Sequence, residues 1–237
     1  RQFHNNSIKS LALDGDGNLL AGTDNGLYVY QNDNGTLQHI VHDSRNIQSL
    51  TNNIIWNIFA DQEQNIWLGT DYGISLSRYN SALQFIPISQ ITGTGDGNQF
   101  YSLFRDSKGF YWFGGTNGVI RFTHPAGNKH DAIWYRMGDK NHPLSHNRIR
   151  HIYEDREQQL WIATDGSINR YDYNTHQFVH YNIVDSTGTY NTNWAYYLFE
   201  DTDGKLWIAT CLGGIFVVDK QKLVQSSGGT YIAEQNY

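Results

Sequence analysis

Polar and apolar residues alternate along this chain in short stretches that are typical of β-strands. One set of stretches is rich in aromatic and β-branched residues: IIWNIFA at 54–60, QFYSLFR at 99–105, RIRHIYE at 148–154 and WAYYLFE at 194–200. Apolar side chains fall on both faces of these stretches, as Ile58 and Phe59 show. They therefore predict strands that lie between two layers. No apolar stretch keeps a 3.6-residue period for long enough to predict a helix.

Three further strands are predicted after each stretch of this first set. Second strands are indicated by IWLGT at 66–70 and LWIAT at 160–164. Third strands are indicated by GISLSRY at 73–79 and GVIRFT at 118–123, and fourth strands by LQFIPI at 83–88, IWYRM at 133–137 and QFVHYNI at 177–183. Short turns rich in glycine, asparagine and aspartate connect them. The pattern predicts four-stranded antiparallel units.

A motif with fixed internal spacing repeats five times. Each copy has an asparagine, then an aspartate eight residues later, then an anchor residue six residues after that. The asparagines are Asn6, Asn53, Asn98, Asn147 and Asn193; the aspartates are Asp14, Asp61, Asp106, Asp155 and Asp201; the anchors are Leu20, Trp67, Trp112, Trp161 and Trp207. Successive aspartates are 47, 45, 49 and 46 residues apart, which is the length of one propeller blade.

The spacing predicts an all-β fold, a β-propeller of four-stranded antiparallel blades with five blades present. The blades are expected at residues 1–49, 50–94, 95–143, 144–189 and 190–237. Three departures from the repeat mark local differences. Leu20 replaces the anchor tryptophan, the fourth copy looks one residue short between Trp161 and Gly166, and Cys211 stands where the second copy has Asp71.

A residue that recurs in every copy is more often needed for folding than for binding one ligand. The asparagines suit a turn, because asparagine tolerates left-handed backbone and its amide bonds nearby main chain. Each aspartate is expected to accept backbone N–H groups in the following turn, where Gly17, Gly109 and Gly204 are replaced by Gln64 and Gln158 in two copies. The tryptophans are expected in the core between blades, with a partner for the indole N–H.

The positions that vary between copies are better candidates for recognition. Residues seven and five positions before each aspartate share one strand face and lie where the central depression of a propeller opens. Loops after the second strand should reach the same rim. The predicted ligand-binding residues are Trp56, Asp71, Tyr72, Tyr101, Arg148, Arg150, Asp165, Trp194 and Tyr196. Aromatic faces and hydrogen-bonding groups together suit a carbohydrate, although the same side chains could pack between blades or face water.

Composition and short motifs exclude several other functions. The formal charge is -6 and 17% of the 237 residues are charged, without a basic run, so no nucleic-acid partner is expected. The DGDGN segment at 14–18 lacks the later glycine and glutamate of an EF-hand, and the histidines have no ligand spacing, so no metal or other cofactor is expected. No apolar run reaches the roughly 18 residues of a membrane span.

The repeats at 50–79 and 144–181 resemble the two-component regulator propeller repeat, with asparagine, aspartate, tryptophan, threonine and glycine recurring in order. The resemblance implies the periplasmic sensor region of a hybrid two-component system of Bacteroidetes. Such sensors are expected to carry about fourteen repeats in two seven-bladed rings, followed by an immunoglobulin-like domain, a membrane helix, a histidine kinase, a receiver and a DNA-binding module. Five repeats then favour part of a seven-bladed ring over an unusual five-bladed closure.

Three functions follow from this reading. The first is a non-catalytic sensor that binds an oligosaccharide, joins further blades and downstream domains of the same protein, and works as a homodimer. The second is a glycan lyase or hydrolase, for which Asp71, Asp165, His151 and Tyr196 are the possible acid, base or nucleophile, although no spacing singles out a pair. The third is a protein-interaction scaffold.

Overall fold

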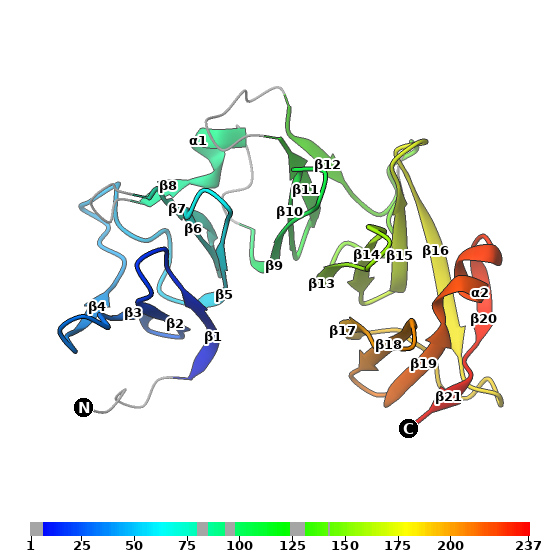
Figure 1. Ribbon diagram of the computed structural model, residues 1–237. Helices are drawn as coiled ribbons and strands as arrows, with labels where there is room; N and C mark the ends of the chain where they lie inside the picture. Colours follow the sequence, from blue (N-terminus) through cyan, green and yellow to red (C-terminus); the bar gives the residue numbers. More distant parts are fainter. Residues whose placement is uncertain (1–6, 80–84, 93–97, 124–130, 142) are drawn as a thin grey trace. The chain divides into compact units, whose positions relative to one another are not determined.

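The computed structural model describes residues 7–79, 85–92, 98–123, 131–141 and 143–237. Its strands form five sheets, drawn in sequence order from blue to red in Figure 1. The first sheet contains β1 (Ile8–Leu13), β2 (Leu19–Thr23), β3 (Gly26–Tyr30) and β4 (Leu37–Ile40). The second contains β5 (Ile55–Ala60), β6 (Ile66–Thr70), β7 (Gly73–Ser77) and β8 (Phe85–Pro87). The third contains β9 (Phe100–Arg105), β10 (Tyr111–Gly115), β11 (Gly118–Phe122) and β12 (Ile133–Tyr135).

The last two sheets depart from this plain order. The fourth contains β13 (Ile149–Glu154), β14 (Leu160–Thr164), β15 (Ser167–Asp172), β16 (Gln177–Val184) and, in addition, β20 (Gly229–Ile232). The fifth contains β17 (Ala195–Glu200), β18 (Lys205–Thr210), β19 (Ile215–Asp219) and β21 (Gln235–Asn236). The predicted all-β fold of four-stranded antiparallel blades is confirmed. The expected Asn6 and the start of the predicted strand at 83–88 lie outside the described residues.

Two compact units make up the chain. Unit 1 comprises residues 1–105 and 122–132, and unit 2 comprises residues 106–121 and 133–237. Unit 1 therefore holds the first two sheets and β9, whereas unit 2 holds β10, β12 and the fourth and fifth sheets. In unit 1, β1 packs beside β5 and β5 beside β9; in unit 2, β13 packs beside β17. Within each unit, the first strand of a repeat thus contacts the first strand of the next repeat.

The arrangement of residues 220–237 was not predicted. After β19 the chain forms α2 (Lys220–Gln225), and then β20 pairs in parallel with β16 before β21 returns to the fifth sheet. Asp219 caps α2 by accepting the Lys222 N–H at 3.0 Å. Six residues are too few to show an apolar period, as is also true of α1 (Ile88–Thr92), so the sequence carried no sign of either helix.

In the last four repeats, the repeated aspartate binds both a turn and the anchor tryptophan. The indole N–H groups of Trp67, Trp112, Trp161 and Trp207 donate to the aspartate of the same repeat at 2.9, 2.7, 2.8 and 2.6 Å. The other carboxylate oxygen accepts the backbone N–H four residues later, for example from Gln159 to Asp155 at 2.9 Å. One side chain thus closes the hairpin and satisfies a buried indole, as scaffold residues should.

The repeated asparagines join one blade to the preceding one. Backbone carbonyls of Asn53 and Asn147 accept N–H groups from Gly26 and Gly118, both at 2.6 Å. The Asn147 side-chain oxygen also accepts the Met137 N–H at 2.7 Å. The four described asparagines of the motif lie in bends or turns before an inner strand, and none of them uses the left-handed backbone that asparagine tolerates.

The fourth repeat is not shortened. Thr164 pairs with Ser167 across the β14–β15 turn, as Thr70 pairs with Gly73 across β6–β7. Ser167 has a φ of 79°, close to the 89° of Gly73, so serine holds the left-handed position that glycine holds elsewhere. The apparent gap arose from aligning Gly166 with Gly73.

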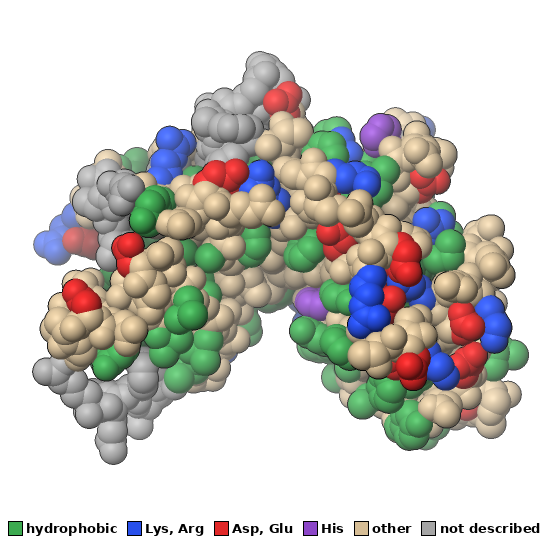
Figure 2. Space-filling view, in the orientation of Figure 1, with side chains coloured by type: hydrophobic (Ala, Val, Ile, Leu, Met, Phe, Trp, Pro, Cys, Tyr) green, Lys and Arg blue, Asp and Glu red, His purple; other side chains and the backbone are tan. Residues whose placement is uncertain are grey.

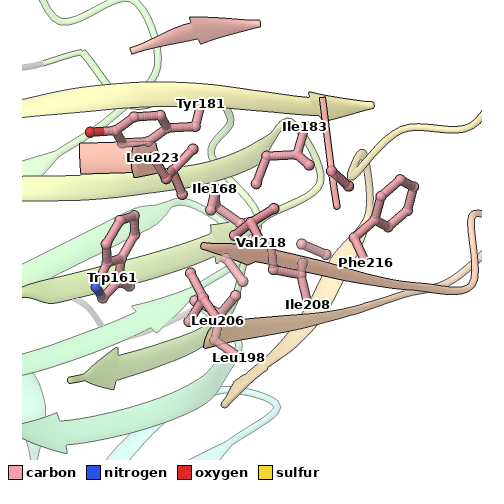
Figure 3. Packing of buried hydrophobic residues seen from close by; sticks show 13 residues of the cluster. Trp161, Ile168, Tyr181, Ile183, Leu198, Leu206, Ile208, Phe216, Val218 and Leu223 are labelled. Atoms are coloured by element: carbon pink, nitrogen blue, oxygen red, sulfur yellow. The ribbon is translucent and has the colours of Figure 1, made fainter. Parts of the chain in front are cut away.

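The cores of both units lie between neighbouring sheets. In unit 2 the cluster around Trp161, Tyr181, Leu206 and Phe216 joins the fourth and fifth sheets, and Leu223 of α2 closes it (Figure 3). In unit 1, Ile55, Leu68 and Phe85 of the second sheet contact residues of the first. Every blade thus depends on a neighbour to bury its apolar face.

The turn after β13 offers a test of backbone strain. Gln158 has a φ of 61°, where the third and fifth repeats have Gly109 and Gly204 at 89° and 76°. We expect Gln158→Gly to raise the free energy of unfolding by about 0.5–1 kcal/mol, because glycine adopts this conformation without strain. The reciprocal change Gly109→Gln, whose Cβ meets nothing within 4 Å, should cost a similar amount. Urea denaturation measures both, and a loss of stability in Gln158→Gly would contradict the expectation.

Candidate functional site

A β-bulge lies at the recognition position of each inner strand whose pairing is described. In β5 the pairing runs from Ile55 directly to Asn57, so Trp56 is the inserted residue. The inserted residues of the other strands are Lys9 in β1, Arg150 in β13 and Tyr196 in β17. A bulge bends the strand and re-aims one side chain. The bulged residue is the one five positions before the repeated aspartate.

In unit 1 the candidate residues form a hydrogen-bonded network centred on Asp71. Its Oδ1 accepts the Trp56 indole N–H at 3.0 Å and the Gln99 amide at 2.7 Å. Tyr101 donates its hydroxyl to Gln99 Oε1, and its ring meets that of Trp56 edge to face at 5.4 Å between centroids. Lys9 Nζ lies 4.3 Å from the Trp56 ring centroid. We call this set the Asp71 network.

In unit 2 the equivalent positions carry a charged version of the same arrangement. Asp165 accepts two bonds from the Arg150 guanidinium, at 2.7 and 3.2 Å, and Arg148 Nε lies 3.9 Å away. The Arg150 guanidinium also lies 4.4 Å from the Tyr196 ring centroid. Trp194 donates its backbone N–H to the Asp165 carbonyl at 3.1 Å. We call this set the Asp165 network.

The two networks share a single geometric rule. The acid after the second strand accepts a hydrogen bond from the bulged side chain of its own blade. That bulged side chain also contacts the side chain at the same position of the next blade, Tyr101 in unit 1 and Tyr196 in unit 2. Trp56 and Asp71 follow the rule in unit 1, and Arg150 and Asp165 in unit 2. Bulged residues therefore form a row that crosses from blade to blade within each unit. The rule holds although the residue types differ.

The exposed fractions of the side chains distinguish residues that a ligand could contact from residues that hold the site in place. Arg150 and Asp165 are mostly covered, with 16% and 9% of their side chains exposed. Trp194 and Tyr196 remain 45% and 43% exposed, and the Arg148 side chain 44%. Trp194 also has a φ of 57°, a conformation that is strained for a tryptophan. The structure thus exposes the Tyr196 ring and the Arg148 guanidinium beside a fixed ion pair, and the exposed Trp194 is joined to the same site through its backbone.

Tyr72 lies outside both networks. It is 57% exposed and lines a separate hollow of about 450 Å³ together with Asp43, Arg45 and Ile47 of the loop between the first two sheets. Its backbone N–H donates to Thr70 Oγ1 at 3.1 Å, which fixes the β6–β7 turn. The other eight predicted site residues belong to the Asp71 or the Asp165 network.

The residues considered for catalysis are engaged in other contacts. His151 Nδ1 accepts the Leu198 backbone N–H at 3.2 Å, and its ring stacks on Tyr197 at 4.1 Å between centroids. Burial lowers the pKa of His151 to about 4. Asp165 is bound by Arg150 as described above. Through these contacts His151 connects the inner strands of two neighbouring blades.

Metal and polyanion binding receive no support from the described part of the chain. No group of three or more His, Cys, Asp or Glu side chains converges there as a metal site. Asp14 of the DGDGN segment accepts the backbone N–H groups of Asp16 and Asn18 at 3.0 and 2.8 Å, as a turn residue does. In the part of unit 2 that Figure 2 shows, basic side chains are interleaved with acidic ones. Lys205 and Glu234 of this unit form an ion pair at 3.0 Å. None of the described helices is long and apolar enough to span a bilayer.

How the predicted site residues are held could not be predicted from the sequence. Gln99 was recognised as a variable position, yet its link between Asp71 and Tyr101 was not expected. Lys9 was likewise one of the variable residues without a stated role. The repeat could have helped to locate the bulges, because a bulge known in one blade predicts a bulge at the same position of the other blades. No residue pattern announces such a bulge directly.

Comparison with known proteins adds a family match. The family model described as two component regulator propeller matches residues 49–72, 94–117, 143–166 and 189–211. Each match covers the asparagine, the aspartate and the anchor tryptophan of one of the last four repeats. No curated protein gives a significant match.

Solved structures provide the remaining comparisons. The extracellular domain of the hybrid two-component system BT4673 from B. thetaiotaomicron is 86% identical over the whole of this chain, with a TM-score of 0.63. That of BT3049 from the same organism is 19% identical over 94% of this chain, with a TM-score of 0.71. The chain covers only 32% and 29% of those two structures. Virginiamycin B lyase from Staphylococcus aureus, 11% identical over 93% of this chain and itself covered to 69%, has a TM-score of 0.66 and shares the fold alone.

Proposed function

This chain belongs to the two-component regulator propeller family, and we propose that it is part of a sensor that binds a carbohydrate fragment and signals to a histidine kinase. The segment lies outside the cytoplasm, in keeping with its 86% identity to an extracellular sensor domain. In the proposed protein it joins further propeller blades and downstream domains and acts as a homodimer. Binding, with no catalysis, is the activity proposed for the segment itself.

The observation that carries the carbohydrate proposal is the Asp165 network. Exposed faces of Trp194 and Tyr196 can cover the apolar C–H side of a sugar ring, and Arg148 can donate hydrogen bonds to its hydroxyls. The Arg150–Asp165 pair keeps Tyr196 in place through the contact of the guanidinium with the ring. A site held this firmly loses little conformational entropy when a ligand binds.

The row of bulged residues also supplies a way for binding to act on the fold. Arg148 directly precedes β13 and Tyr196 belongs to β17, so a ligand that contacts both fixes one inner strand relative to the next. Ligand binding of this kind favours one arrangement of blades by its difference in affinity between arrangements. We propose that this change in blade arrangement transmits the signal to the rest of the protein.

Removal of the exposed aromatic rings tests the proposed site. We expect Trp194→Ala and Tyr196→Ala each to weaken binding of a responsive oligosaccharide by about 1–2 kcal/mol, roughly five- to thirtyfold in Kd. Phe199→Ala is the matched control, since Phe199 is an exposed aromatic residue of the same strand outside the Asp165 network. A panel of neutral and acidic oligosaccharides is screened by thermal shift and the hits are measured by titration calorimetry. Equal affinity in all three variants would remove this site from consideration.

A further inference from the structure

The first blade lacks the tryptophan that fills the same place in the other blades. Trp67, Trp112 and Trp161 are fully buried, and each donates its indole N–H to the aspartate of its repeat. Leu20 occupies this position in the first blade, on β2, and is 3% exposed. A leucine side chain is smaller than an indole and has no N–H to donate. The exchange therefore removes both volume and one hydrogen-bond donor.

A cavity of about 230 Å³ lies where that volume is missing. Its apolar walls come from both neighbouring sheets, with Leu20, Leu27 and Val29 from the first and Ile66 and Phe85 from the second. All five of these side chains are buried. The other lining residues are mostly polar and include Asp14, Gln38, Gln64 and Arg78. A cavity that combines apolar walls with hydrogen-bonding groups is the usual form of a small-molecule site.

Asp14, which lines the cavity, shows which hydrogen bond has been lost. In the second blade, Asp61 Oδ2 accepts both the Asn65 side-chain amide at 3.0 Å and the Trp67 indole at 2.9 Å. In the first blade, Asp14 Oδ2 accepts the Asn18 side-chain amide at 2.9 Å, and leucine replaces the indole. A carboxylate oxygen accepts two donors, as Asp61 demonstrates in the same chain. Asp14 therefore keeps the acceptor that an indole uses in the sister blades.

We propose that this cavity binds a small, uncharged, planar aromatic ligand that carries an N–H donor at its edge. The ring occupies the place of the missing indole, between the apolar walls, and its N–H is donated to Asp14 Oδ2. Because the walls come from both sheets, the ligand joins the first blade to the second. The cavity shares no residue with the Asp71 and Asp165 networks. The indole proposal is therefore tested independently of the proposed carbohydrate site.

Indole itself is the probe, and Leu20→Trp is the decisive variant. We expect saturable indole binding by the unchanged protein, observed by titration with ligand- and protein-detected NMR. In Leu20→Trp the new side chain fills the cavity, so binding should weaken at least tenfold while the melting temperature rises. Leu19→Trp is the matched control, because Leu19 is adjacent on β2 but 37% exposed and does not line the cavity. It should bind indole as the unchanged protein does.

A second measurement does not depend on any variant folding. We expect 1-methylindole, which has the same ring without the N–H, to bind the unchanged protein at least fivefold more weakly than indole. Absence of saturable indole binding would overturn the proposal, and so would undiminished binding in a folded Leu20→Trp variant. Equal affinity for indole and 1-methylindole would show that Asp14 is not the acceptor and would also overturn it.

Discussion

Replacement of Lys220 by methionine is expected to lower the free energy of unfolding by about 3–5 kcal/mol. The Lys220 ammonium group is 2% exposed and lies 3.2 Å from Asp155 Oδ2 and 2.6 Å from Glu200 Oε1, and it also contacts Glu157. The Asp155 and Glu200 carboxylates are themselves almost completely buried, at 0% and 1% exposed. Methionine fills similar space but leaves two buried carboxylates without their cation.

Both carboxylates also accept other hydrogen bonds, so loss of the ammonium group should weaken those contacts too. Asp155 accepts the Trp161 indole N–H at 2.8 Å, and Glu200 accepts the Arg156 backbone N–H at 2.9 Å. Lys220 is the first residue of α2. Its ion pairs with Asp155 and Glu200 attach the segment that contains α2 and β20 to the fourth and fifth sheets. Loss of the ammonium group should therefore loosen the joint between these two sheets as well as the helix.

Lys222→Met is the control for this prediction. Lys222 lies in the same helix and is 64% exposed, and its ion pairs with Asp219 and Glu234 are at 3.3 and 3.4 Å. Exposed pairs of this kind contribute about 0–1 kcal/mol, so the control should lose no more than that. Denaturation in urea at neutral pH measures both variants. Similar losses in the two variants would show that the buried cluster has no special role.

Acidification from pH 7 to pH 4 is expected to destabilise unit 2 through His151 by up to about 3 kcal/mol. Burial lowers the pKa of His151 in the folded protein to about 4, from an ordinary value of 6.5. As the pH falls below 6.5 the unfolded chain binds a proton that the folded protein refuses, so the unfolding free energy decreases until about pH 4. A difference of about 2.5 units at 1.36 kcal/mol per unit gives the stated magnitude.

A serine at position 151 separates this effect from the titration of carboxylates. In the first repeat Ser10 takes the equivalent place, and its hydroxyl accepts the Ile58 backbone N–H at 3.0 Å, as His151 accepts that of Leu198. His151→Ser thus keeps an acceptor between the blades and removes the ionisable ring. We expect the decrease in unfolding free energy between pH 6.5 and 4 to become smaller by the same amount. An unchanged pH dependence, measured by urea denaturation at several pH values, would refute the assignment to His151.

Sequence alone determined the blade and its repeated parts. The five copies of asparagine, aspartate and anchor fixed the spacing, and the strands predicted at 66–70 and 160–164 coincide with β6 and β14. These features follow from local chemistry, because a hairpin, its turn and its anchor lie within about twenty residues of one another. The predicted need of each indole for a partner was met by the aspartate six residues earlier. The recognition positions could be chosen because they vary where the scaffold does not.

Only the tertiary structure decided how those positions are used. The bulges at Trp56 and Arg150 depend on the pairing of two strands, which a period of two along one strand does not contain. The pairing of Lys220 with Asp155 and Glu200 brings together residues that are 65 and 20 positions apart in the sequence. The cavity beside Leu20 needs walls from two blades. Sequence spacing fixes what each blade contains, whereas contacts between blades decide which of its side chains are covered, paired or left open to a ligand.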